Sequence, residues 1–339
     1  SGFERAPTMD ILLQQIINGL TTGSVYAVVA LGYTMVYGVI QLINFAHGEV
    51  VMIGAMVAFS VISSLAGSSL PPLLIVLAGV IAAIPACMVM GYLLERAAYR
   101  PLRHAPRLAP LITAIGMSIV LQHLALLVWG RNPLAFPQII DNRVFGIGGA
   151  AISSVQIAII LLSLTMMAGL SWFVYRTRFG IAIRATAENV HVASLMGVNA
   201  DRVIAATFVI GAGLGAVAGV MYGSYYGIAH YTMGFSLGLK AFSAAVLGGI
   251  GNIAGAMLGG ILLGLVEALG TGYVGDLTNL CRWPGAGAGM GWMGERCADG
   301  AHFVLFGSNY QEVFAFLMLI LVLVFRPSGL LGERVSERA

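Results

Sequence analysis

Five ionisable side chains stand inside long apolar stretches, where a charge is costly to keep. They are His47, Glu49, His123, Lys240 and Glu267. A charged group at the centre of a bilayer costs roughly 2.5–3.5 kcal/mol or more, so such a residue asks for a functional or structural reason. The sequence shows no nucleophile–base arrangement beside them and no His/Cys spacing typical of a metal site. These residues therefore indicate a role in a translocation path or in an ion pair, and not in catalysis.

His47 and Glu49 stand two residues apart, which on a regular helix would point them about 200° away from each other. A turn or a helix end would let both side chains reach polar surroundings. Two interpretations of Glu49 remain open. It caps the N-terminus of a helix over 50–66, where the helix dipole favours a carboxylate, or it contributes to a translocation path.

The other three residues have simpler expectations. His123 follows Gln122 in an apolar run and is expected to be a hydrogen-bonded interior residue. Lys240 is expected to extend toward a nearby membrane interface, and Glu267 either to do the same or to pair with Lys240.

The composition is that of a protein dissolved in lipid. Of 339 residues, 59% are hydrophobic and 9% are charged, whereas a soluble domain carries roughly a quarter charged residues. Disordered chains are poorer in apolar residues, and a nucleic-acid-binding protein would need a basic stripe. The single lysine, Lys240, is followed by Ala241, which excludes a G-x-x-x-x-G-K-[ST] phosphate-binding loop. We expect an all-α, polytopic transmembrane helix bundle.

A helix needs roughly 20 apolar residues to cross a membrane. Seven runs approach or reach this length, at 11–31, 50–66, 72–94, 110–129, 154–175, 203–226 and 313–325. Two further regions, 33–48 and 238–268, are interrupted by Gly, Asn or His and are expected to be broken or re-entrant. The sequence thus predicts about 8–10 membrane elements in one transmembrane domain over 9–332. Residues 1–8 are expected to be an expression remnant or a flexible N-terminus.

The arginines predict the orientation of the bundle, because Arg and Lys accumulate in short cytoplasmic loops. They cluster at 96–107, at 176–202 and at 326–338. We therefore expect a cytoplasmic C-terminal tail at 333–339 and an external, Gly-rich loop at 269–312. In that loop Cys281 and Cys297 form a disulfide in an oxidising compartment or stay free thiols, while Cys87 is expected in the core.

Two polar interruptions share a pattern. Asn44 and Asn252 each stand in a Gly-flanked, otherwise apolar stretch. Paired interruptions of this kind indicate a binding path in repeat-built transporters. Asn44 and Asn252 are therefore the first candidates for a substrate path, followed by His47 and Glu49, and an internal repeat is a hypothesis.

Glycines recur every four residues in two series, which predicts smooth strips for close helix packing. The series are Gly211, Gly215, Gly219 and Gly223, and then Gly251, Gly255 and Gly259.

The arginine-rich segment 176–202 carries an apolar stripe between residues 185 and 196, with Arg184, Glu188 and Asn189 on another face. This pattern predicts one short amphipathic helix ended by Gly197 at the C′ position. Such a helix either lies on lipid or docks into a groove of another protein.

Several of these stretches resemble the permease subunits of branched-chain amino acid ABC transporters, and most specifically the LivH-like members. The motifs are INFAHGE at 43–49, RATAEN at 184–189, LGGIGN at 247–252 and RPSGL at 326–330, together with 18–38, 178–180 and 195–197. The resemblance covers 9–332. The loop 277–309 departs from the family pattern by its glycines and two cysteines.

The resemblance implies a multi-pass subunit of the bacterial inner membrane that imports branched-chain, hydrophobic amino acids. Its partners would be a second homologous permease subunit, two cytoplasmic ATP-binding subunits, a periplasmic substrate-binding protein and membrane lipid, with no nucleic acid. ATP and Mg would be bound by the partner subunits, so this chain would carry no cofactor and no catalytic residue. The segment 184–199 would be the helix that couples to an ATP-binding subunit, through Arg178, Arg184, Glu188, Asn189 and Gly197.

Two alternatives remain open. The same class of importer could carry urea, short amides or other amino acids. From a different class, the chain could be an ion-coupled secondary transporter that works without ATP-binding subunits.

Overall fold

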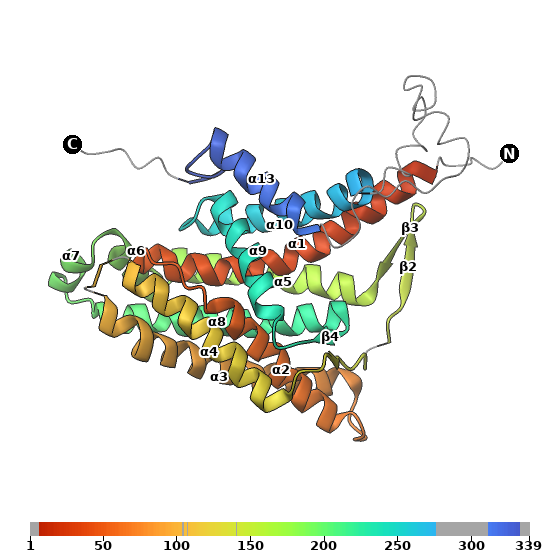
Figure 1. The fold of residues 1–339 in the computed structure, drawn as a ribbon, viewed down its shortest axis with the longest axis horizontal. Helices are drawn as coiled ribbons and strands as arrows, with labels where there is room; N and C mark the ends of the chain where they lie inside the picture. Colours follow the sequence, from red (N-terminus) through yellow and green to blue (C-terminus); the bar gives the residue numbers. More distant parts are fainter. Residues whose placement is uncertain (1–6, 104, 107, 140, 276–310, 333–339) are drawn as a thin grey trace.

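The computed structural model describes residues 7–103, 105–106, 108–139, 141–275 and 311–332 (Figure 1). Within these ranges seven helical segments are long and apolar enough to cross a membrane, and two shorter apolar helices accompany them. The long ones are built on α1 (Pro7–Ile40), α2 (His47–Leu65), α3 (Pro72–Leu94), α4 (Leu108–Trp129), α5 (Ser154–Arg176), α8 (Ala200–Tyr226) and α10 (Ile253–Leu269). The shorter ones are α9 (Met233–Gly248) and α13 (Gln311–Phe325). The expected helix bundle is confirmed.

The centre of the bundle is formed by α1 and α8. In its most apolar window α1 has 83% of its residues buried, against 22% for α3 and α4. Large apolar side chains such as Ile81, Ile112, Leu127 and Trp172 are exposed on the outer helices. Since a water-soluble bundle would bury such residues, these helices present a surface suited to lipid.

Glycines allow the central helices to approach backbone to backbone, as the four-residue series predicts. A Cβ atom added at Gly219 of α8 would lie 2.9 Å from the Ala55 nitrogen of α2, and one added at Gly19 would lie 2.8 Å from Leu265 Cα of α10. Gly255 and Gly259 face the backbone of α9, whereas Gly251 does not belong to this strip, because it lies in the turn with φ +96°. The second series is therefore shorter than expected.

The first expected interruption is shorter than 33–48. Helix α1 continues without a break to Ile40, because residues 33–40 contain no proline and only one glycine. The chain then turns at Gln41, whose φ is 51°, and residues 41–46 are non-helical. This unwound segment leads into α2, which begins at His47.

The second interruption is a full helical hairpin. Helix α9 ends at Gly248, Gly249 adopts φ 106°, and Asn252 caps α10. The Leu330 and Leu331 amides donate to the carbonyls of Leu247 and Gly248 at 2.9 Å. The turn therefore lies beside the chain that follows α13.

The arginine-rich segment forms two helices, α6 (Arg178–Glu188) and α7 (Val190–Leu195), and not the single helix expected. Figure 1 shows them at one end of the bundle, together with the end of α3 and the start of α8. We call this the Arg-rich end. Two antiparallel strand pairs lie away from it: β1 (Leu134–Ala135) with β4 (Ile228–Ala229), and β2 (Val144–Ile147) with β3 (Ala150–Ser153).

Candidate functional site

The unwound segment places His47 and Glu49 on opposite sides of the first turn of α2, as their spacing predicts. The buried His47 ring meets the Tyr33 ring edge-on, with 4.9 Å between the centroids, and packs against Gly32. His47 Nε2 has no hydrogen-bond partner among the residues that the structure describes. His47 thus presents a polar atom inside the bundle.

Glu49 faces α4 and α9. The Ser118 hydroxyl donates to Glu49 Oε1 at 3.1 Å, while Oε2 is buried and accepts no hydrogen bond from the described part of the chain. A Cβ atom added at Gly234 would lie 2.5 Å from Oε2, so the first turn of α9 runs directly beside the carboxylate. The partial positive charge of two helix N-termini, α2 and α9, favours an anion here.

The capping interpretation of Glu49 is only partly right. The helix begins at His47 and not at residue 50, so Glu49 lies inside its first turn. Within the described residues no side chain forms a capping hydrogen bond at Ala46, the N-cap of α2. Glu49 interacts with the helix dipole but does not cap a backbone amide.

The two asparagines have different environments. Tyr99 donates its hydroxyl to Asn44 Oδ1 at 2.9 Å, and the Asn44 carbonyl accepts from the His47 amide at 3.0 Å. Asn252 Oδ1 accepts from the Gly255 amide at 3.0 Å, and Nδ2 donates to the Leu331 carbonyl at 2.9 Å. The structure therefore brings Asn44 together with His47 and Glu49, but it holds Asn252 in the α9–α10 turn.

Lys240 and Glu267 form an ion pair, which confirms one of the two expectations for Glu267. Lys240 Nζ lies 2.5 Å from Glu267 Oε1 and 3.9 Å from Glu312 Oε1 at the start of α13. The Lys240 ammonium also lies 5.9 Å from the Tyr26 ring centroid. Sequence reasoning missed Tyr26 and Glu312, because nothing in the sequence indicates that their helices meet α9.

His123 does not lie in the interior. Its side chain is exposed on the outer face of α4, and Nδ1 lies 2.9 Å from the Ile119 carbonyl one turn earlier. Cys87 is buried as expected, and its thiol donates to the Val50 carbonyl at 3.3 Å. Cys281, Cys297 and the tail 333–339 lie outside the described residues.

The residues expected to form the coupling segment follow one another along α6 and α7. Arg178 begins α6, Arg184 stacks over the Tyr175 ring at 5.5 Å, and Glu188 ends the helix. Asn189 breaks the segment, because its side chain accepts from the His191 and Val192 amides at 3.0 Å and so starts α7. Gly197 follows α7 with φ +86°, as its predicted C′ position requires.

Helix α7 and its C-terminal residue present apolar side chains to the outside. Leu195 is 74% and Met196 81% exposed, and Val190 and Val192 are exposed beside them. Exposed apolar side chains on a short helix in a charged environment are typical of an interaction surface. We call Val190, Val192, Leu195 and Met196 the α7 patch.

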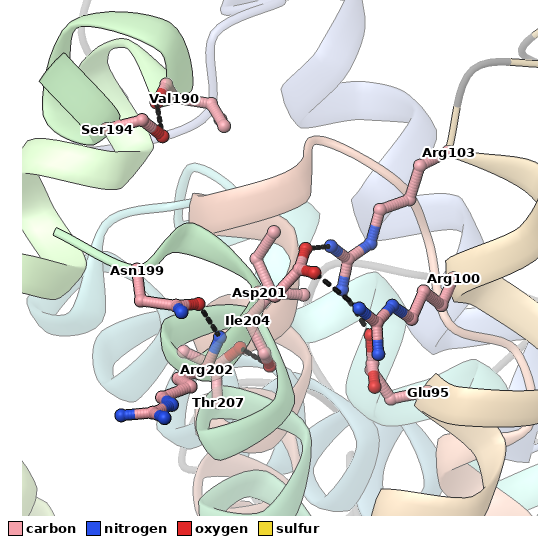
Figure 2. Close-up of polar contacts among 10 residues, drawn as sticks. All are labelled: Glu95, Arg100, Arg103, Val190, Ser194, Asn199, Asp201, Arg202, Ile204 and Thr207. Carbon is pink, nitrogen blue, oxygen red and sulfur yellow. Dashed lines mark hydrogen bonds and ion pairs between the residues drawn. The ribbon is translucent and has the colours of Figure 1, made fainter.

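A second polar cluster at the Arg-rich end was not predicted. Arg100 and Arg103 both bind Asp201 of α8, and Arg103 also binds the buried Glu95 (Figure 2). The sequence shows the arginines only as a charge cluster. In the described residues no group of three or more His, Cys, Asp or Glu is arranged to hold a metal ion.

The chain is similar to known transport proteins over nearly its whole length. A family model described as the permease component of branched-chain amino acid transport systems matches residues 15–323. The high-affinity branched-chain amino acid transport system permease protein BraD of Pseudomonas aeruginosa is 47% identical over 96% of this chain and 97% of the relative. The corresponding protein LivH of Escherichia coli is 43% identical over the same shares. No solved structure matches the chain.

Proposed function

The chain belongs to the family of permease components of branched-chain amino acid transport systems, and on that premise we propose that it forms part of the membrane path of an ATP-driven importer for branched-chain amino acids. A permease component of this family is not itself catalytic. In this proposal the energy for transport comes from ATP hydrolysis on other subunits, which would bind the ATP and Mg.

The α7 patch is the observation that carries this proposal. Its apolar side chains are exposed at the end of the bundle where arginines gather, and the positive-inside rule assigns that end to the cytoplasm. There α6 and α7 fit a cleft of an ATP-binding subunit, in the way that an amphipathic helix fits an apolar groove. The last helix, α13, leads toward the same end, so the C-terminus would be cytoplasmic.

The remaining partners follow from the family. A second homologous permease subunit would complete the path, a second ATP-binding subunit would pair with the first, and a periplasmic binding protein would deliver the amino acid. The complex would lie in the bacterial inner membrane.

Alternating access would move the amino acid past Asn44, His47, Glu49 and Asn252. Of these, His47 Nε2 and Glu49 Oε2 are buried and have no hydrogen-bond partner among the described residues, so they are the atoms that substrate or water would pair with when the path opens. Asn44 and Asn252 already use their side chains for hydrogen bonds within the chain. A zwitterion needs polar groups along an apolar path, because an unpaired charge is costly to desolvate. We therefore place the path closest to the first turn of α2.

The cargo is identified by comparing the uptake of different labelled compounds. Membrane vesicles that hold the whole complex should accumulate labelled leucine and not labelled urea. Preferential uptake of urea or short amides would show that the chain belongs to an importer with a different substrate.

Coupling is tested by co-purification with the ATP-binding subunits. The double variant Glu188→Ala, Gly197→Val should lose the ATP-binding subunit that docks on this chain, because the first change removes a side chain at the end of α6 and the second strains a backbone at φ +86°. Gly169→Val is the matched control, since no described atom outside its own stretch of helix lies within 4 Å of a Cβ added there. If both ATP-binding subunits stay bound to the double variant, and substrate still stimulates hydrolysis to the same extent, the coupling assignment is wrong.

A further inference from the structure

We propose that Asp201, Arg103 and Tyr99 are positioning residues that transmit movement of α6 and α7 to the unwound segment 41–46. We call the connected set Asp201, Arg100, Arg103, Glu95, Tyr99 and Asn44 the Asp201–Asn44 network. The inference rests on the proposed function, because it takes the ATP-binding subunits as the source of the movement.

The network begins where α7 is joined to α8. The Val198 amide donates to the Ala193 carbonyl at 3.0 Å, which holds the connection against α7. Asn199 then caps α8, because its Oδ1 accepts from the Arg202 amide at 3.1 Å. Asp201 lies in that first turn (Figure 2). A displacement of α7 therefore reaches Asp201 through a connection of a few residues.

Asp201 is bound by two arginines of the segment that follows α3. Arg100 Nη2 lies 2.6 Å from Oδ2, and Arg103 Nη1 lies 2.5 Å from Oδ1. Arg103 also pairs with Glu95, which is 2% exposed. Figure 2 shows the Arg103 side chain reaching both carboxylates. Because Glu95 is buried and Asp201 is half exposed, Arg103 connects the surface of the protein to its interior.

Glu95 and Tyr99 mark the two ends of η1 (Glu95–Tyr99), a π-helical turn that continues α3. The Tyr99 ring packs against Phe208 of α8, with 5.0 Å between the centroids. Its hydroxyl donates to Asn44 Oδ1 at 2.9 Å and lies 3.4 Å from the Ile43 carbonyl. Arg103, which binds Asp201, also binds Glu95 at the start of this turn, and Tyr99 at its end holds the unwound segment.

In this proposal the π-helical turn Glu95–Tyr99 is the element that changes its arrangement when α7 moves. Such turns occur frequently at functional sites, and conversion to an ordinary α-helical turn shifts the register by one residue, which rotates the following side chains by about 100°. At Tyr99 this rotation would break the hydrogen bond to Asn44. The segment that orients His47 and Glu49 would then be released, so the state of the path would follow the position of α7.

The test separates coupling from stability in the purified complex. In proteoliposomes, Asp201→Asn should keep both ATP-binding subunits and ATP hydrolysis within about twofold of wild type, while amino acid uptake per ATP falls about tenfold, within the range for residues that connect distant sites. Tyr99→Phe should act in the same direction. Asp201→Glu, which keeps the carboxylate, should retain most of the uptake per ATP.

Two variants serve as matched controls. Tyr92→Phe removes a hydroxyl from an exposed ring on α3, and Asp141→Asn removes a carboxylate far from the network. Both should behave as wild type. Asp201 and Tyr99 act in series. The double variant Asp201→Asn, Tyr99→Phe should therefore lose no more uptake per ATP than the single variant with the larger loss.

Three results would overturn the inference. The first is a lower melting temperature of Asp201→Asn with unchanged uptake per ATP, which would make the network purely structural. The second is a double variant whose fold loss in uptake per ATP equals the product of the fold losses of the two single variants. The third is a wild-type complex without ATP-driven uptake, which would overturn the proposed function and this inference with it.

Discussion

Replacing Lys240 with methionine should destabilise the protein by about 3–5 kcal/mol, because it leaves a buried carboxylate without its cation. Lys240 Nζ lies 2.5 Å from Glu267 Oε1, and Glu267 is fully buried. Glu267 Oε2 has no hydrogen-bond partner among the described residues. Methionine keeps most of the lysine stem, so the loss reports the missing charge and not a cavity.

A double-mutant cycle shows whether the cost comes from the unpaired charge. Lys240→Met combined with Glu267→Gln should recover most of the loss, because no unpaired charge remains. Glu267→Gln alone should cost less than Lys240→Met, since Lys240 is 13% exposed and keeps Glu312 at 3.9 Å. Glu312→Gln should cost no more than about 1 kcal/mol, because the Glu312 side chain is about half exposed.

The assay is thermal unfolding of the purified protein in detergent micelles, with the four variants measured side by side. The predicted order of stability is wild type and Glu312→Gln, then the double variant and Glu267→Gln, then Lys240→Met. If Lys240→Met is as stable as wild type, or if the double variant is no more stable than Lys240→Met, the reasoning is refuted.

The remaining predictions concern packing, the α7 patch and the α9–α10 turn. Gly219→Ala should cost about 1–3 kcal/mol in thermal unfolding, because the added methyl meets the α2 backbone, whereas Gly116→Ala, with no described atom within 4 Å, should be neutral or stabilising by up to about 1 kcal/mol. Asn189→Ala should weaken the start of α7 by about 1 kcal/mol and reduce the co-purified ATP-binding subunits; full retention would contradict this role. Asn252→Ala should lower the melting temperature and leave the KM for uptake unchanged, and a raised KM would instead show that Asn252 contacts substrate.

Six of the seven long apolar helices in the described residues could be predicted from the sequence, because each apolar run must satisfy its backbone internally. The seventh, α10, lay within the region 238–268 that was expected to be broken, and the run 313–325 forms a shorter helix. The residues at which the helices begin and end were harder to predict, because they depend on single side chains and backbone angles. Helix α1 passes through 33–40 since nothing there stops it, and the break comes at Gln41. Asn189 divides the coupling segment because its side chain accepts hydrogen bonds from the following backbone amides. The pattern of apolar and polar residues does not show that an asparagine will cap a new helix in this way.

The site was predictable where the partners are close in sequence or where only one cation was available. The spacing of His47 and Glu49 correctly predicted that they face opposite ways, and the only lysine was a ready partner for Glu267. The pairing of Asp201 with Arg103 joins residues 98 positions apart and depends on how α3 and α8 cross. His123 was wrongly expected in the interior, because an apolar run does not show which of its faces meets lipid.

The central claim is that ATP-binding subunits drive transport through this chain. Uptake of labelled leucine by right-side-out vesicles tests it most directly. Vesicles that contain the whole complex, the binding protein and internal ATP are predicted to accumulate leucine, and vesicles with the same chain but without the ATP-binding subunits to accumulate none. Gradient-driven accumulation of leucine by this chain alone would contradict the account.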